Sequence, residues 1–523
     1  MNVPERLRTV FVWAAFLAVV VLALVFRVIQ LDRRVAHNDE ANQVYKTGVL
    51  YDTGVYHYDA YEHHGPSLYY LSVPLLKLSG AAGYAQSQLP TYRLLPALFG
   101  VGLVLLLLMT RRGLGWGETW VAALLTAVSS GMTYYSRFYI QEILLVFFTF
   151  GLIACGWRYL KNRKLVWAIA AGACAGLMHA TKETCVIAYA CAGLGLVLTV
   201  IWCDRGLSLS RFKVQPSHVV GAVLTTIIVS VVLFSSFFTH PVGVLDSIRT
   251  YFTYLERGSG ESTEHVYPFM TYLQTLVYQK DGGLVWSEGV IMALGLIGLV
   301  LVACNAAVVR KADVGLSRFL VVYTVLMTLA YSAIPYKTPW CMLSFLHGWI
   351  LLAGIGAVGV FRLLGRWPLQ LVWVLVVAFG VEKLSTQTCH AVFRFGADAR
   401  NPYAYGHTVQ PYMNLVNRVH DVAATHPDGK AMRIAVVTTP ADAWPSPWYL
   451  RAYPNVGYWT SVAELPEGFD PSVLIVSADL EDDFTTQTRD AFVNEYWGLR
   501  VDALLGLYIK KDAWDLFMAS RGG

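Results

Sequence analysis

Long blocks of apolar residues recur along most of this chain and constrain its fold more than any other feature. A helix needs about 20 mostly apolar residues to cross a membrane, and we count about eleven such blocks before residue 382. Only 14% of the residues are charged, whereas soluble domains carry roughly 25%. The sequence therefore predicts an α-helical polytopic membrane protein. Its net charge of +5 is small for 523 residues and argues against a nucleic-acid partner.

The first block runs from about Thr9 to Leu31. It is longer than the roughly 7–15 apolar residues of a signal peptide, so we expect an uncleaved anchor. The pair of blocks over 165–202 is interrupted by polar residues at 179–183. The ten blocks after the first, this pair included, have centres near Leu105, Leu125, Leu145, Ala170, Leu194, Val229, Leu296, Val325, Leu352 and Val374.

Basic residues occupy alternate connections between these blocks. Short loops rich in Lys and Arg face the cytoplasm by the positive-inside rule. We therefore expect the N-terminus in the cytoplasm, and segments 32–91 and 240–283 and the C-terminal tail on the outer side of the plasma membrane. The basic set is Arg6, Arg8, Arg111, Arg112, Arg158, Lys161, Arg163, Lys164, Arg205, Arg211, Lys213, Arg310, Lys311, Arg318, Arg362 and Arg366.

The composition changes after about Glu382, which divides the chain into a membrane module over 1–382 and a small outer domain over 383–523. β-branched runs predict strands at 433–439, 473–477 and 506–510, and helices are expected at 411–425 and 485–496. Strands that alternate with helices indicate an α/β domain with a mostly parallel sheet. No GxGxxG or P-loop motif occurs in it, so we expect a structural or acceptor-guiding role.

Two adjacent carboxylates follow the first span closely. Asp39 and Glu40 would lie near the headgroup level, where mutual repulsion and partial desolvation can raise the pKa of one of them and make it a general base. The alternative is an acidic helix start with Asp39 as its N-cap.

A second cluster of ionisable residues precedes Pro66. In an extended chain Glu62 and His64 share one face and His63 lies opposite. A carboxylate and an imidazole can hold Zn, Mn or Mg, with His265 of the second large outer loop as a further ligand. Alternatively, these histidines hydrogen-bond substrate hydroxyls, and we expect Tyr61 and His63 on the acceptor side. The run 67–78 predicts a helix, either on the membrane surface or packed against the bundle.

Three shorter outer features add charge near the membrane. Glu142 enters the top of a span, where an acid needs a partner, which Arg137 can supply. Lys182 interrupts an apolar stretch and either binds a phosphate or pairs with Glu142 or Glu183. Lys337 lies outside, against the positive-inside trend, which also favours a phosphate contact; Arg137 is a third candidate for it.

The motifs that carry these residues are HNDEA at 37–41, EHHGPSLYYL at 62–71, YYSRFYIQE at 134–142, HATKE at 179–183 and YKTPW at 336–340. Together they resemble the GT-C glycosyltransferases, in the branch of protein O-mannosyltransferases and aminoarabinose transferases, and are most similar to the members called "flippase activity-associated". The resemblance covers about the first 380 residues. It implies a polyprenyl-phosphate sugar donor, and transfer to a lipid, glycan or protein acceptor on the outer leaflet with inversion.

The resemblance also implies roles for individual residues. Asp39 would be the base and Glu40 would position it, while Glu62 matches a metal-binding acid of the aminoarabinose transferases. Glu142 matches an acid on the acceptor side. Lys182 and Lys337 match lysines beside the donor phosphate. Glu183 departs from the family, which more often has glycine there.

Three other functions can be compared with these features. A membrane-embedded metal hydrolase would need three protein ligands and an open position, and the HEXXH motif is absent. A transporter or flippase of lipid-linked sugars would also carry charges at membrane depth, but it predicts internal repeats and helices broken near the midplane. A non-catalytic membrane scaffold that presents the C-terminal domain is the third. No clear repeat is found, and the charges gather at the outer ends, which favours the transferase.

Overall fold

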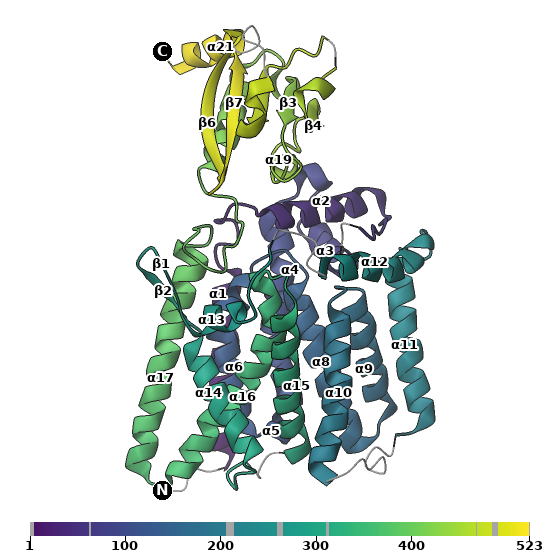
Figure 1. The fold of residues 1–523 in the computed structure, drawn as a ribbon, viewed down its shortest axis with the longest axis vertical. Helices are drawn as coiled ribbons and strands as arrows, with labels where there is room; N and C mark the ends of the chain where they lie inside the picture. The colour runs from purple at the N-terminus through teal and green to yellow at the C-terminus, as the bar shows by residue number, and fades with distance from the viewer. Residues whose placement is uncertain are drawn as a thin grey trace.

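The computed structural model describes residues 5–61, 64–204, 214–258, 265–309, 313–466, 468–483 and 490–521. A bundle of helices occupies one end of the molecule and a small sheet domain the other (Figure 1). The N-terminus lies at the far end of the bundle from this domain. The described helices of the bundle are α1 (Glu5–Val28), α4 (Leu89–Leu106), α5 (Arg111–Leu114), α6 (Trp116–Val128), α7 (Ser130–Tyr135), α8 (Glu142–Asn162), α9 (Leu165–His179), α10 (Cys185–Asp204), α11 (Pro216–Phe234), α14 (Gly289–Ala303), α15 (Val314–Ala333), α16 (Leu343–Leu364) and α17 (Trp367–Cys389).

Eight of the described helices are long and apolar enough to cross a membrane. These eight spans correspond to α1, α4, α8, α10, α11, α15, α16 and α17, with bounds that differ by at most a few residues. The three other expected spans, near Leu125, Ala170 and Leu296, are the shorter helices α6, α9 and α14 of 13, 15 and 15 residues. The prediction of a helical multi-pass membrane protein is confirmed, whereas the count of about eleven full-length spans is not.

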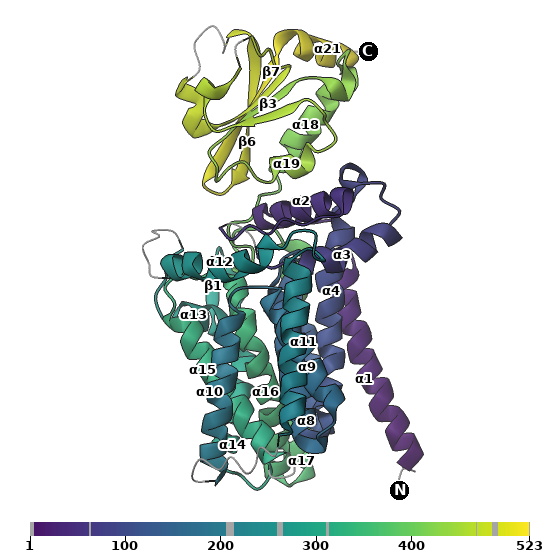
Figure 2. The same cartoon turned by 90° about the vertical axis from the view of Figure 1, so that its right-hand side faces the viewer.

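Short elements cover the end of the bundle that faces the sheet domain. These are α2 (Asn38–Thr53), α3 (Ser67–Leu78), α12 (Val242–Gly258), α13 (Thr271–Val277) and a hairpin of β1 (Gln279–Asp281) and β2 (Leu284–Trp286). Both views show α2 and α12 lying across the bundle rather than along it (Figures 1 and 2). The helix predicted at 67–78 is therefore present as α3.

The C-terminal domain is built on a five-stranded sheet in the order β4-β3-β5-β7-β6. β3 pairs in parallel with β4 and β5, but β7 is antiparallel to both β5 and β6, so the expected mostly parallel sheet is a mixed one. The helix expected at 411–425 is α18. The helix expected at 485–496 is wrong: 492–500 is strand β6, and 484–489 lie outside the described residues. The bounds are α18 (Tyr412–Thr425), β3 (Ile434–Val437), α19 (Ser446–Tyr449), β4 (Val456–Trp459), β5 (Val473–Ser477), β6 (Phe492–Arg500), β7 (Ala503–Lys510) and α21 (Lys511–Arg521).

The segment between the last long helix and the sheet domain packs against the bundle. α17 continues to Cys389, and buried side chains up to Ala404 pack in the core of the bundle. A second core contains residues of the sheet domain between Tyr412 and Phe517, together with Val35 of the first outer segment.

The contacts between the sheet domain and the outer segments include two hydrogen bonds: Ala36 N donates to Tyr449 Oη at 2.8 Å, and Arg451 donates to the Ser87 carbonyl at 2.8 Å. Ring contacts of Tyr45 with Trp444 and of Tyr84 with Trp448 add to them.

Candidate active site

The first outer helix, α2, begins with a cap that fixes the orientation of the acidic pair. His37 is the N-cap: its Nδ1 accepts a hydrogen bond from Asp39 N at 2.9 Å, and its Nε2 lies 3.1 Å from the Tyr405 carbonyl. Because a carbonyl only accepts, Nε2 carries the proton and His37 is neutral. Burial lowers the pKa of His37, in agreement with this tautomer. The N-cap is thus His37 rather than Asp39.

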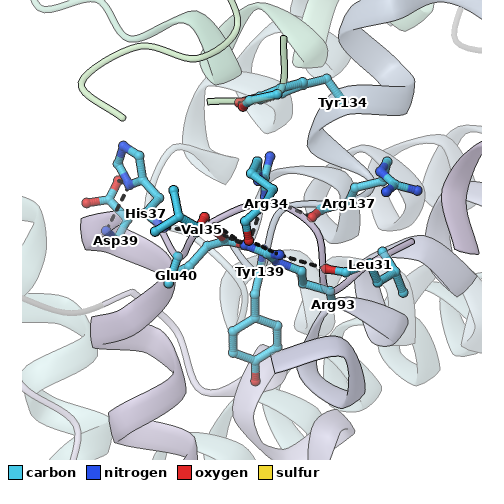
Figure 3. A network of polar contacts seen from close by, with 12 residues as sticks. Leu31, Arg34, Val35, His37, Asp39, Glu40, Arg93, Tyr134, Arg137 and Tyr139 are labelled. Carbon is cyan, nitrogen blue, oxygen red and sulfur yellow. Dashed lines mark hydrogen bonds and ion pairs between the residues drawn. The ribbon is translucent and has the colours of Figure 1, made fainter. Parts of the chain in front are cut away.

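Glu40 lies at the centre of a buried ion-pair network (Figure 3). Its carboxylate is fully buried, lies 2.7 Å from Arg93 Nη2 and 3.0 Å from Arg34 Nη2, and accepts from Tyr139 N at 2.9 Å. Burial alone would raise the pKa of Glu40, but the two guanidinium groups lower it well below its usual range. Glu40 therefore remains ionised and holds the first outer loop against the bundle.

Arg137 has a different partner from either of those expected. Its guanidinium donates to the carbonyls of Phe26 at 3.0 Å, Ile29 at 2.8 Å and Gln30 at 2.9 Å. These carbonyls end α1, where a cation is favoured by the helix dipole. Arg137 therefore caps the end of α1, and its guanidinium is held by backbone carbonyls rather than by Glu142.

Asp39 differs from Glu40 in exposure. Its side chain is 41% exposed, compared with 0% for Glu40. Asp39 and Gln43 are four residues apart and lie on the same face of α2. Gln141 donates to the Gln43 side-chain oxygen at 3.0 Å, which links this face of α2 to the residue directly before Glu142.

Glu142 and Lys182 form a buried ion pair. The lysine bonds only one carboxylate oxygen, and Glu142 Oε2 is buried without a hydrogen-bond partner among the described residues. Burial opposes the charge of Lys182, but Glu142 raises the pKa of the lysine well above its usual range. One of the pairings considered for Lys182 is thus the one observed.

Glu183, the departure from the family pattern, pairs with the first outer loop instead. Its carboxylate lies 2.8 Å from His64 Nδ1 and accepts from Tyr58 Oη at 3.2 Å. Burial would raise the pKa of Glu183, and the neighbouring His64 lowers it overall. The same two segments meet again where Ser67 N donates to the Ala180 carbonyl at 2.8 Å. The turn that carries Lys182 is therefore fastened to the loop that contains His64.

Lys337 lies on a third segment that reaches the same region. It is 2% exposed, its ammonium donates to the Ile334 carbonyl, and its backbone N donates to the His265 carbonyl at 2.9 Å. His265 Nδ1 in turn lies 2.6 Å from Tyr405 Oη. Since the Tyr405 carbonyl contacts His37, a continuous set of contacts joins Lys337 to the cap of α2.

The predicted metal ligands do not form a site among the described residues. Glu62 and His63 lie outside them, and Tyr61 is 70% exposed. The Nδ1 atoms of His64 and His265 bond to Glu183 and Tyr405 respectively. No group of three His, Cys, Asp or Glu side chains in the described part of the chain is arranged to hold a metal ion. The described donors therefore do not fit the expected metal.

Comparisons with known proteins agree with one another on the architecture. Residues 17–243 match the family model of dolichyl-phosphate-mannose-protein mannosyltransferases. ArnT from Cupriavidus metallidurans, solved with undecaprenyl phosphate, is 14% identical with a TM-score of 0.59 over 94% of this chain and 97% of its own. The oligosaccharyltransferase AglB from Archaeoglobus fulgidus, solved with an inhibitory peptide and a dolichol-phosphate, is 11% identical with a TM-score of 0.57 over 97% of this chain and 77% of its own. No curated protein sequence matches the chain.

The protein has the GT-C fold. This confirms the resemblance inferred from the outer motifs, and it confirms a small sheet domain after a GT-C membrane module. Another structure of the Archaeoglobus fulgidus oligosaccharyltransferase, described as a complex with Zn and sulfate, has a TM-score of 0.57 at 13% identity over 96% of this chain and 75% of its own. Zn is thus present in one structure of similar fold, while the described residues of this protein offer no such site.

Sequence reasoning missed the partners that organise the candidate site. Arg93 lies in an apolar helix, and a charge at such a position is a signal of a buried partner, yet nothing in the sequence connects it to Glu40. The spacing of His37 and Glu40 is that of a capping box, which was readable. Gln43, Gln141 and Tyr405 gave no signal, because uncharged polar residues are common in loops and at helix ends.

Proposed function

We propose that the protein transfers a glycosyl group from a polyprenyl-phosphate-linked sugar to an acceptor at the outer face of the membrane, with Asp39 as the general base. The acceptor is a lipid, a glycan or a protein, and the anomeric carbon is inverted. The proposal builds on the GT-C fold and on the family match over 17–243.

The observation that carries the proposal is the convergence of three outer segments on α2. Gln43, on the face of α2 that bears Asp39, contacts Gln141, which precedes the Glu142–Lys182 pair. His37, two residues before Asp39, is joined through Tyr405 and His265 to Lys337. The segments that carry Asp39, Lys182 and Lys337 are thus joined by hydrogen bonds. This supports a shared site in which a carboxylate deprotonates the acceptor and lysines stabilise the leaving phosphate.

The reaction divides between these groups. The Asp39 carboxylate takes the proton of the acceptor hydroxyl as its oxygen bonds to the anomeric carbon. The bond from that carbon to the phosphate oxygen breaks, and both of its electrons leave with polyprenyl phosphate. Attack from the face opposite the leaving group inverts the carbon. Glu40 keeps α2 and its cap in place but does not take the proton, because two arginines stabilise its ionised form.

Lys182 and Lys337 stabilise the charge that develops on the leaving phosphate. Fixed cations in a site with little water can contribute several kcal/mol to such a step. The Lys182 ammonium leaves the Glu142 carboxylate and binds the phosphate in its place. The carboxylate oxygen Oε2, which lacks a partner among the described residues, is then free to accept from an acceptor hydroxyl. This supports the assignment of Glu142 to the acceptor side.

The charge distribution supports the orientation. Lys161 and Arg362 are in the last turns of α8 and α16. α5, which carries Arg111 and Arg112, lies near the N-terminal end of the bundle, opposite the sheet domain (Figure 1). The positive-inside rule puts that end in the cytoplasm. The sheet domain and the site are then outside, and the domain guides the acceptor.

The experiment is transfer in reconstituted membranes. Purified protein is incubated with a panel of polyprenyl-phosphate sugars and candidate acceptors, and products are identified by mass spectrometry. We expect Asp39→Asn to lower transfer at least about 100-fold, the usual scale for loss of a general base, with donor binding retained. Asp52→Asn, at the other end of α2, is the matched control and keeps full activity.

Two results would contradict the proposal. Full activity of the Asp39→Asn variant would show that Asp39 is not the general base. Movement of the lipid-linked sugar across the bilayer without a new glycosidic product, measured in the same vesicles, assigns the protein to the transporter class instead.

A further inference from the structure

A cavity lies at the outer end of α17, beside the β1–β2 hairpin, and shares no residue with the proposed transfer site. Its volume is about 360 Å³, within the range of about 300–1,000 Å³ typical of ligand pockets. Trp286 from β2, Val290 from α14 and Phe395 supply apolar walls. Lys383 of α17 and His390, directly after it, add polar groups.

One hydrogen-bond donor of a residue that lines this cavity lacks a partner in the described part of the chain. Trp286 is 2% exposed, and its indole N–H has no acceptor among the described residues. The Gln387 side chain also lines the cavity, but its oxygen accepts from Ser287 N at 2.8 Å and its nitrogen donates to Ser130 Oγ at 2.9 Å. Since an indole N–H and a lysine ammonium can only donate, the complementary ligand has oxygen acceptors.

The surroundings indicate that this ligand is a lipid. Below the cavity, α17 exposes Val372, Leu375 and Phe379 by 57%, 60% and 64%, as expected of a helix that faces hydrocarbon. Lys383 follows one turn later, with its Nζ 4.9 Å from the centre of the Phe379 ring and 3.0 Å from Glu382. Both charges of the Lys383–Glu382 pair are exposed, and such a pair is weak, so the ammonium can turn to a phosphate.

We infer that this cavity binds the headgroup of an anionic phospholipid of the outer leaflet. Phosphate oxygens accept from the Trp286 indole and from Lys383, and an acyl chain follows the apolar face of α17. The inference does not rest on the proposed transferase activity, because its residues and its ligand are separate from Asp39 and Lys182.

The test measures retained lipid on the full-length protein. The protein is reconstituted in phosphatidylcholine nanodiscs with phosphatidylglycerol as the minor component, transferred to detergent, and analysed by native mass spectrometry. We expect one phosphatidylglycerol on the wild type, and at least about fivefold lower occupancy for Lys383→Gln and for Trp286→Phe, the scale of one lost hydrogen bond to a charged group. Lys280→Gln, on exposed β1 of the same hairpin, is the control and keeps the lipid.

Three outcomes would overturn the inference: equal occupancy in all four proteins, equal retention of phosphatidylcholine by the wild type, or preferential displacement of phosphatidylglycerol by an added polyprenyl phosphate. Because the Lys383 side chain is 59% exposed, Lys383→Gln tests the inference even where Trp286→Phe lowers the stability of the fold.

Discussion

Asp39 and Glu40 are neighbours in sequence with opposite environments. One side chain is 41% exposed and the other is fully buried against Arg34 and Arg93. The sequence predicts that two adjacent carboxylates have a functional role, but it does not show which one is exposed and which one is buried in ion pairs. That difference depends on Arg93, which lies more than fifty positions away in another helix.

Glu40→Gln is expected to lower the free energy of unfolding by about 3–5 kcal/mol, because two buried guanidinium groups lose their shared counter-charge. Thermal melting in detergent measures this. Asp39→Asn, on the neighbouring exposed side chain, should shift the free energy by less than about 0.5 kcal/mol. Equal melting of both variants would contradict the structural role of Glu40.

The same carboxylate predicts a pH dependence. The folded protein holds the pKa of Glu40 well below its usual range, so its stabilisation is present above the unfolded pKa of about 4.3. It is lost as the pH falls from there toward the folded pKa. The melting temperature of the wild type should therefore fall more steeply below about pH 4.3 than that of Glu40→Gln. Parallel curves would exclude this linkage.

The Lys182–Glu142 pair separates a structural role from a catalytic one. Lys182→Gln leaves a buried carboxylate unpaired and should cost about 3–5 kcal/mol. Lys182→Gln with Glu142→Gln removes both charges and should recover much of that stability, but not transfer, since the phosphate contact is still missing. Recovery of transfer in the double variant would show that Lys182 serves only to neutralise Glu142.

At the scale of elements, the hydrophobic blocks predicted the eight described helices that are long and apolar enough to cross a membrane, because burial in a bilayer imposes a simple pattern on sequence. The pattern did not reveal that α6, α9 and α14 are short. It also misassigned 492–496, where Phe492, Val493 and Tyr496 favour a strand. That strand, β6, exists through its pairing with β7, for example Val493 opposite Ile509, which is a tertiary contact.

Gly65 shows how tightly the first outer loop meets the turn before Lys182. A Cβ at Gly65 would lie 2.3 Å from the Ala180 carbonyl oxygen, a backbone atom that cannot turn away. Gly65→Ala should therefore separate the two segments and lower transfer at least about tenfold, the scale of a small misplacement at a reacting site. Gly156→Ala, in α8 with open space around it, is the control and should retain activity.

At the scale of the whole molecule, the sheet domain lies over α2 (Figure 2). Arg451 stacks on Trp448, with its guanidinium carbon 3.5 Å from the ring centre, and donates to the Ser87 carbonyl at 2.8 Å. The composition change indicated a second domain but not this contact. Nor did it indicate that residues up to Ala404 belong to the bundle core, because polar linkers and polar loops look alike in sequence.

Arg451→Gln is expected to loosen this contact without unfolding either part. Hydrogen exchange of residues 34–48 should become faster and transfer should fall by a few-fold, as for loss of about 1 kcal/mol. Arg521→Gln, at an exposed ion pair within the sheet domain, should change neither. Unchanged exchange in Arg451→Gln would mean that the domain does not restrain α2.

The buried lysine of the Glu142–Lys182 pair has a consequence for turnover. Under the proposed mechanism, when polyprenyl phosphate leaves, the Glu142 carboxylate pairs with the Lys182 ammonium again, since a group attached to the same protein acts at high effective concentration. Glu142 then neutralises Lys182, and polyprenyl phosphate must displace this carboxylate in order to rebind. Competition from Glu142 would therefore weaken product inhibition by polyprenyl phosphate.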